Sequence, residues 1–137
     1  MSAQHPDIRD RALETWGGKV KLRFKTAGSG PPLVYFHPAA GLHFDPFLAA
    51  LSESYTVYAP EHPGTSEGDP DAIHQVDNLW DLVLIYEEAN RRLELPRAPV
   101  AIGQSFGGMM AAEIAAHFPS LFAKLVLLDP IGLWRAD

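Results

Sequence analysis

Ser105 is the residue of this sequence whose type and neighbours point most directly to chemistry. It lies in Gly103-Gln104-Ser105-Phe106-Gly107, which fits the pattern G-x-S-x-G, between an apolar run and a segment rich in Ala and Met. A serine on such a sharp strand-to-helix turn needs flanking glycines, because a Cβ at either position would press on the strand or helix. The pattern predicts a nucleophile at a helix N-terminus, where free N–H groups favour developing negative charge. An ordinary helix-capping serine is the alternative.

The elements that must position this serine follow from the spacing of apolar residues. Residues 11–16 and 19–26 are predicted to form a hairpin around Gly17-Gly18, because in the second segment apolar and charged residues alternate. Residues 33–37 are apolar without alternation, which is typical of a strand buried on both faces. The remaining predictions are strands at 55–60, 99–103 and 123–128, helices at 44–52, 75–93 and 106–117, and a surface loop at 61–71.

This order of elements predicts an α/β fold. Strands and helices alternate after the opening hairpin, which favours a mostly parallel, doubly wound sheet with helices on both faces and an antiparallel hairpin at the N-terminus. The length of 137 residues suits one domain with a real core but not two.

Composition excludes several classes of function. The net charge of −6, without a basic cluster, argues against nucleic acid as a partner. No apolar run approaches the ~18 residues that span a membrane, and the N-terminus has no signal-peptide pattern, so we expect no membrane partner and a cytoplasmic location. The absence of cysteine and the scattered acids and histidines give no reason to expect a metal or any other cofactor.

From about Arg11 onward the sequence resembles the N-terminal half of an α/β-hydrolase. The similarity rests on the glycine-flanked serine, on the opening segment through Gly28-Ser29-Gly30-Pro31-Pro32, and on Glu61-His62-Pro63-Gly64-Thr65-Ser66 after the predicted strand 55–60. The resemblance implies that residues 1–137 are the N-terminal part of a hydrolase core whose cap and C-terminal part are absent from this chain. It further implies that a second polypeptide or a C-terminal continuation supplies the catalytic histidine and an acid.

The resemblance also implies an oxyanion hole. The family usually has His-Gly where this sequence has His37-Pro38, and proline has no N–H to donate. The donors carried over from the family are therefore the N–H groups of Ala39 and Phe106. His37, Gln104 and Trp134 are assigned to the substrate pocket, with His37 shaping the loop rather than accepting a proton.

Two further polar residues have competing interpretations. Asp129 ends the last predicted strand on the same side as Ser105, where some relatives place the triad acid, but Asp129-Pro130 is also an ordinary turn signal. His62 follows a strand and could line a pocket mouth, although a surface position is the favoured interpretation.

The function that follows is hydrolysis of an ester or related carbonyl compound, a small-molecule substrate, through an acyl-serine intermediate and without a cofactor. One alternative is a truncated, non-catalytic module of the same fold that binds a ligand or partner. Another keeps the serine but changes the chemistry to C–C bond hydrolysis, cofactor-free haloperoxidation or acyl transfer to an alcohol.

Overall fold

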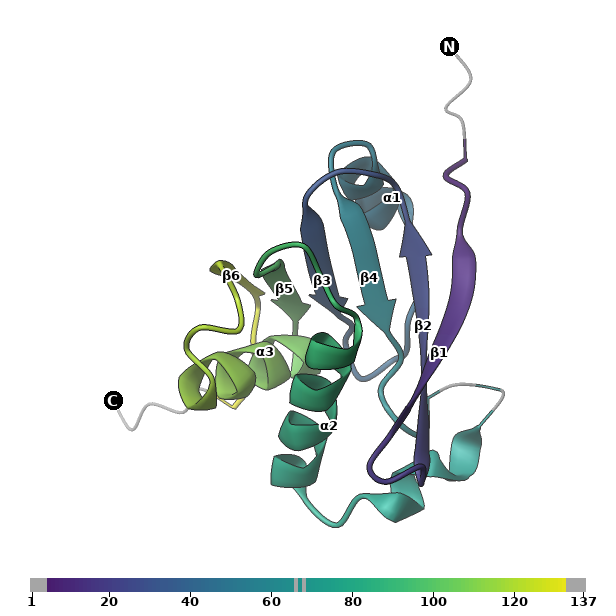
Figure 1. The fold of residues 1–137 in the computed structure, drawn as a ribbon, viewed down its shortest axis with the longest axis vertical. Coiled ribbons are helices and arrows are strands. Elements are labelled where there is room, and N and C mark those ends of the chain that lie inside the picture. The colour runs from purple at the N-terminus through teal and green to yellow at the C-terminus, as the bar shows by residue number, and fades with distance from the viewer. Residues whose placement is uncertain (1–4, 66, 68, 133–137) are drawn as a thin grey trace.

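A computed structural model describes residues 5–65, 67 and 69–132 of the chain and shows one twisted sheet with helices packed against it (Figure 1). The elements follow one another as β1 Arg9–Thr15, β2 Val20–Ala27, β3 Pro32–Phe36, α1 Pro46–Ser52, β4 Thr56–Pro60, the 3-10 helix η1 Pro70–Gln75, α2 Leu79–Arg92, β5 Val100–Gln104, α3 Phe106–His117 and β6 Lys124–Leu128. Among these residues, no helix is long and apolar enough to cross a lipid bilayer.

The strand order in the sheet is β1-β2-β4-β3-β5-β6. β1 and β2 form the antiparallel hairpin, and β2 also pairs antiparallel with β4. β4, β3, β5 and β6 run parallel to one another. The predicted α/β fold, mostly parallel with an N-terminal antiparallel hairpin, is therefore confirmed.

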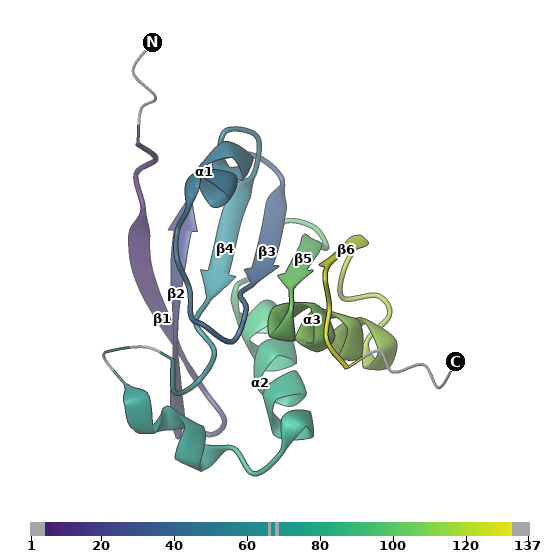
Figure 2. The same cartoon turned by 180° about the vertical axis from the view of Figure 1, so that it is seen from behind.

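Helices cover both faces of the sheet. α1 lies on one face, and α2 and α3 lie together on the other, as the front and back views show (Figures 1 and 2). β3 has no exposed side chain because alternate residues enter two cores: Val34 and Phe36 pack under α2 and α3, and Leu33 and Tyr35 pack under α1. This explains why its sequence is apolar without alternation.

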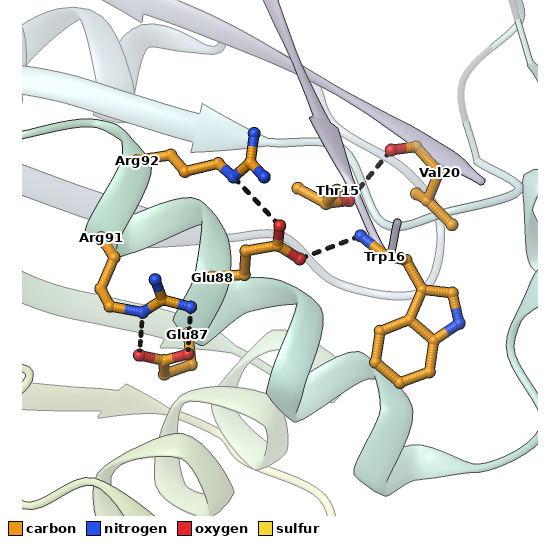
Figure 3. Close-up of polar contacts among 7 residues, drawn as sticks. All are labelled: Thr15, Trp16, Val20, Glu87, Glu88, Arg91 and Arg92. Atoms are coloured by element: carbon orange, nitrogen blue, oxygen red, sulfur yellow. Dashed lines mark hydrogen bonds and ion pairs between the residues drawn. The ribbon is translucent and has the colours of Figure 1, made fainter. Parts of the chain in front are cut away.

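The hairpin is fastened to α2 by one carboxylate. Glu88 accepts the backbone N–H of Trp16 at 2.9 Å and pairs with Arg92 at 3.0 Å (Figure 3). Trp16 is left-handed, with φ 58°, and the hydroxyl of Thr15 closes the same turn by donating to the carbonyl of Val20 at 3.0 Å. The turn that the Gly17-Gly18 pair predicts is thus held by its neighbours as well as by its glycines.

Two predicted segments differ most from the structure. The predicted helix 75–93 begins at Leu79, because the side chain of Asn78 caps it by accepting the N–H of Asp81 at 3.1 Å while Val76 is extended. The predicted surface loop 61–71 is wrong in part, since His62 and Pro63 are buried and η1 begins at Pro70. A 3-10 helix of this length lacks the apolar repeat that marks an α-helix in a sequence.

Candidate active site

Ser105 connects β5 to α3 in a conformation that L-residues rarely adopt. Its φ is 55° and its ψ is −117°, outside the helical and strand regions, and its side chain is half-buried. Its side chain makes no capping hydrogen bond to the helix that follows. A strained non-glycine residue persists only where its surroundings over-determine it. The geometry therefore favours the nucleophile interpretation over the helix-capping alternative.

The flanking glycines are required by close backbone contacts. A Cβ at Gly103 would collide with the carbonyl of Gly107, and a Cβ at Gly107 would collide with the carbonyls of Phe36 and His37 at the end of β3. The predicted reason for these two glycines is therefore confirmed. The start of α3 is pressed against β5 on one side and against the end of β3 on the other.

The backbone of Ser105 is also bound to the neighbouring strand. Its N–H donates to the carbonyl of Leu128, the last residue of β6, at 3.0 Å, and its carbonyl accepts the N–H of Ile131 at 3.3 Å. Asp129 lies between these contacts, exposed and left-handed with φ 45°. Asp129 thus follows β6 beside the serine, and a role as triad acid stays a prediction.

The two predicted oxyanion donors come from adjacent strands. β3 pairs directly with β5, with Phe36 opposite Gly103, so the chain leaves both strands at the same edge of the sheet. Ala39 lies in an exposed turn after β3, and Phe106 is the first residue of α3, where an N–H has no partner within the helix. The assignment of both N–H groups to an oxyanion hole stays a prediction.

A buried pair of histidines lies beneath this edge of the sheet. His37 follows β3 and is 0% exposed, and His62 follows β4 and is 4% exposed. Their ring centroids lie 3.9 Å apart. His62 is therefore not on the surface, because its ring packs between His37 and α2 rather than facing solvent.

The partners of the two rings define their tautomers. The backbone N–H of His62 points at Nε2 of His37 at 2.9 Å, so this nitrogen accepts, and Nδ1 of His37 donates to the carbonyl of Pro38 at 2.6 Å. Nε2 of His62 donates to the carbonyl of His37 at 2.8 Å, and its Nδ1 accepts from the hydroxyl of Tyr86. Every ring nitrogen is satisfied only if both imidazoles are neutral.

Burial shifts the titration of this cluster toward neutral forms. Burial, followed by the nearby His37, lowers the pKa of His62 to about 3. Burial also lowers the pKa of His37, with the neighbouring His43 acting in the same direction and the Pro38 carbonyl and Glu61 opposing it. Burial raises the pKa of Tyr86 well above its ordinary value. The cluster is a network of neutral hydrogen-bonding groups at neutral pH.

The three residues predicted for the substrate pocket have different surroundings. Gln104 is exposed at the end of β5, where its Oε1 accepts from the hydroxyl of Tyr35 at 3.0 Å. His37 is fully buried, and its Nδ1 donates to the carbonyl of Pro38 at 2.6 Å, while its assignment to the substrate pocket stays a prediction. Trp134 lies outside the described residues.

The remaining histidines are on the surface, and none of the described histidine rings has a hydrogen bond to Ser105. Over the same residues, no three carboxylates or histidines gather as metal ligands would. The described side chains thus provide a candidate nucleophile and a buried polar network.

His62 and Tyr86 are the residues that sequence reasoning missed. The available signal was topological: His37 and His62 each end one of two neighbouring parallel strands, so their side chains meet at one sheet edge. Tyr86 lies within the predicted helix 75–93, where its apolar neighbours indicate only a core position.

Comparison with known proteins places these features in a family. The model of a family described as "Alpha/beta hydrolase family" matches residues 29–137. An uncharacterized protein of Mycobacterium tuberculosis is 30% identical over 124 residues, which is 82% of this chain and 33% of that protein. A pimeloyl-[acyl-carrier protein] methyl ester esterase of Nitrosomonas europaea is 28% identical over 86% of this chain and 45% of its own length.

The fold also matches solved structures. A putative lipase from Acinetobacter baumannii has a TM-score of 0.75 at 24% identity, covering 94% of this chain and 44% of the lipase. At that identity the match concerns the fold alone. The chain spans from 33% to 45% of the lengths of these three proteins.

Proposed function

The chain belongs to the alpha/beta hydrolase family, and on that premise we propose that it carries the nucleophile of a serine hydrolase that acts on esters or related carbonyl compounds. The observation that carries this proposal is the conformation of Ser105, at φ 55° between β5 and α3 with glycines pressed against backbone on both sides. A serine held in this way presents its hydroxyl at the sheet edge rather than to the helix.

The proposed reaction proceeds through an acyl-serine. Oγ of Ser105 attacks the substrate carbonyl and gives its proton to a base, while the N–H groups of Ala39 and Phe106 stabilise the oxyanion. The C–O bond to the leaving alcohol then breaks, and the alcohol takes the proton from the base. Water, deprotonated by the same base, attacks the acyl-serine; the acyl–Oγ bond then breaks, the base returns the proton to Oγ of Ser105, and the acid is released.

The base in this proposal is a histidine supplied from outside the described residues, by a C-terminal continuation or a second polypeptide. Two observations support it: the buried His37 and His62 are committed to other partners, and this chain matches under half of the length of its relatives. The family orders its triad as serine, acid and histidine along the chain, which agrees with a histidine beyond these residues.

Covalent labelling tests the proposal. The complete gene product that contains these residues is incubated with a fluorophosphonate probe, and its intact mass is measured with and without the probe under native conditions. We expect one adduct on Ser105, lost in Ser105→Ala. Ser29→Ala is the matched control, because Ser29 is exposed and stands between Gly28 and Gly30, and its labelling should equal that of the wild type.

Other outcomes of the same experiment contradict the proposal. A folded protein that takes no label is the result expected of a non-catalytic module of this fold. Labelling that persists in Ser105→Ala removes the assignment of this serine as the nucleophile. The native mass also reports whether a second polypeptide accompanies the chain.

A further inference from the structure

We propose that the His37 imidazole is a positioning residue for the oxyanion hole, which fixes the direction of the Ala39 N–H through the carbonyl of Pro38. This inference rests on the proposed function, because it concerns how one of the two proposed donors is aimed. It assigns a task to a buried histidine that otherwise has no part in the chemistry of Ser105.

The Pro38–Ala39 peptide group links the imidazole contact to the proposed donor. The carbonyl of Pro38 and the N–H of Ala39 belong to the same planar unit, and no peptide bond in the described residues is cis. In a trans peptide the C=O and N–H bonds point in opposite directions. Whatever holds the Pro38 carbonyl therefore sets the direction of the Ala39 N–H.

Two donors hold that carbonyl. Nδ1 of His37 donates to it at 2.6 Å, and the N–H of Gly41 closes the turn on it at 3.1 Å. The turn by itself is poorly restrained, because Ala39 and Ala40 are exposed and Gly41 is left-handed with φ 107°. Without the imidazole, one hydrogen bond within an exposed turn would have to keep the peptide from rotating.

The tautomer of His37 is fixed by its second contact. The N–H of His62 cannot accept a hydrogen bond, so Nε2 of His37, 2.9 Å away, has to be the unprotonated nitrogen. The proton of the neutral ring then lies on Nδ1 and faces the Pro38 carbonyl. The ring is fully buried and packs at a tilt against the ring of His62, with centroids 3.9 Å apart, which restricts its rotation.

His62 and Tyr86 anchor this arrangement to α2. The ring of His62 donates to the carbonyl of His37 at 2.8 Å and accepts from the hydroxyl of Tyr86. It also packs edge-on against Phe106, with ring centroids 5.0 Å apart. Both proposed oxyanion donors, Ala39 and Phe106, are thus adjacent to the same histidine pair.

A pair of substitutions at position 37 isolates the proposed contact. In His37→Asn the side-chain amide can place an N–H near the position of Nδ1, which preserves a donor to Pro38. In His37→Gln the amide reaches the position of Nε2 instead, so the partner of the His62 N–H is kept and the Pro38 contact is lost. Both variants are polar and of similar volume, and His117→Gln, at an exposed helix end, serves as the control.

The experiment measures hydrolysis of p-nitrophenyl acetate by the complete gene product. Rates are divided by the number of sites that a fluorophosphonate finally labels, so that misfolded protein is not counted. We expect His37→Gln to lower kcat per labelled site by about tenfold to a hundredfold with KM changed by less than about twofold. His37→Asn should stay within about threefold of the wild type, and His117→Gln should be unchanged.

Each other outcome overturns the inference. If both variants at position 37 keep the wild-type kcat, or if both lose it equally, a donor at the position of Nδ1 is not what matters. If the position-37 variants give one of these results while Ser105→Ala still abolishes labelling and turnover, the inference is overturned and the proposed function stands. If the wild type neither takes the label nor hydrolyses the ester, the proposed function fails, and the inference fails with it.

Discussion

The backbone N–H of Ser105 donates to the carbonyl of Leu128 at 3.0 Å, which fastens the candidate nucleophile to the last residue of β6. The strained φ of 55° at Ser105 is thus held from three sides: by β5 before it, by α3 after it and by β6 beside it. A strained residue needs such surroundings to persist. The strained conformation of Ser105 can therefore be tested by substituting its neighbours as well as the serine itself.

The first prediction concerns Gly107, where a Cβ would collide with the end of β3. We expect Gly107→Ala to lower the free energy of unfolding by about 3 kcal/mol, because the carbonyls of Phe36 and His37 are backbone groups of the sheet and cannot move aside without distorting it. Fluorophosphonate labelling should fall with it. Urea unfolding followed by circular dichroism measures the change.

Gly18→Ala is the matched control for this prediction. Gly18 has φ 82° but open space around its Cα, so an added Cβ costs only the left-handed strain of about 1–2 kcal/mol and leaves labelling intact. If Gly107→Ala lowers the free energy of unfolding less than Gly18→Ala does, the close backbone packing around the serine is not important for stability.

A second prediction concerns Asp129, which is exposed and left-handed with φ 45°. We expect Asp129→Gly to raise the free energy of unfolding by about 1 kcal/mol, because glycine adopts this conformation without strain. Asp129→Ala should lower it relative to Asp129→Gly. Equal stability of the Gly and Ala variants would mean that the turn does not impose this φ in solution.

Asp129→Asn then measures the chemical role of the same side chain. Asparagine tolerates the left-handed conformation and keeps the shape of the aspartate. If Asp129 is the triad acid, kcat for p-nitrophenyl acetate falls by about 10⁴-fold with unchanged stability. If kcat is unchanged, Asp129 has only a structural role, in the turn after β6.

The site shows which features a sequence can predict. The strained serine turn was predictable because its sequence pattern is contiguous, with a glycine two residues before and two residues after Ser105, although the backbone that a Cβ at Gly107 would strike belongs to the distant end of β3. The sheet was predictable for a related reason, since the fully apolar β3 and the alternating β2 differ in how many of their faces are buried.

The histidine pair was not predictable in the same way. His37 and His62 are separated by 25 residues and meet only because β3 and β4 are paired in parallel. The segment after β4 is rich in Gly, Pro and polar residues, a composition typical of surface loops. Its burial depends on α2, through Tyr86, and on the end of β3, and neither contact leaves a periodic pattern in the sequence.

A third prediction compares two carboxylates on α2. Glu87 and Glu88 are similarly exposed, and each pairs with the arginine four residues on, but only Glu88 also accepts the backbone N–H of Trp16 (Figure 3). We expect Glu88→Ala to lower the free energy of unfolding by about 1–2 kcal/mol, because the Trp16 N–H loses a charged acceptor. Glu87→Ala should cost clearly less, since a surface ion pair contributes little. Equal losses in urea unfolding would show that the hairpin does not depend on Glu88.

The last prediction concerns acid. His62 has a pKa of about 3 in the folded protein, lowered by burial and then by His37, against about 6.5 for an unfolded histidine. Between these values the unfolded chain binds a proton that the folded chain excludes, so stability rises with pH in this window. The contribution is complete above about pH 6.5 and is lost as the pH falls toward 3, at about 1.4 kcal/mol for each pH unit. The lowered pKa of His37 acts in the same direction.

Urea unfolding of the complete gene product at several pH values between 7 and 4 measures this slope. His62→Gln keeps a donor for the His37 carbonyl but has no ring to protonate, so the variant should lose stability less steeply as the solution is acidified. His74→Gln is the control, because His74 is exposed in η1 and its removal should leave the slope as in the wild type. If the free energy of unfolding of His62→Gln varies with pH as steeply as that of the wild type, His62 does not exclude a proton in the folded state. The neutral tautomers assigned to the pair would then be wrong, because a charged His62 would have no acceptor at Nδ1 for the Tyr86 hydroxyl.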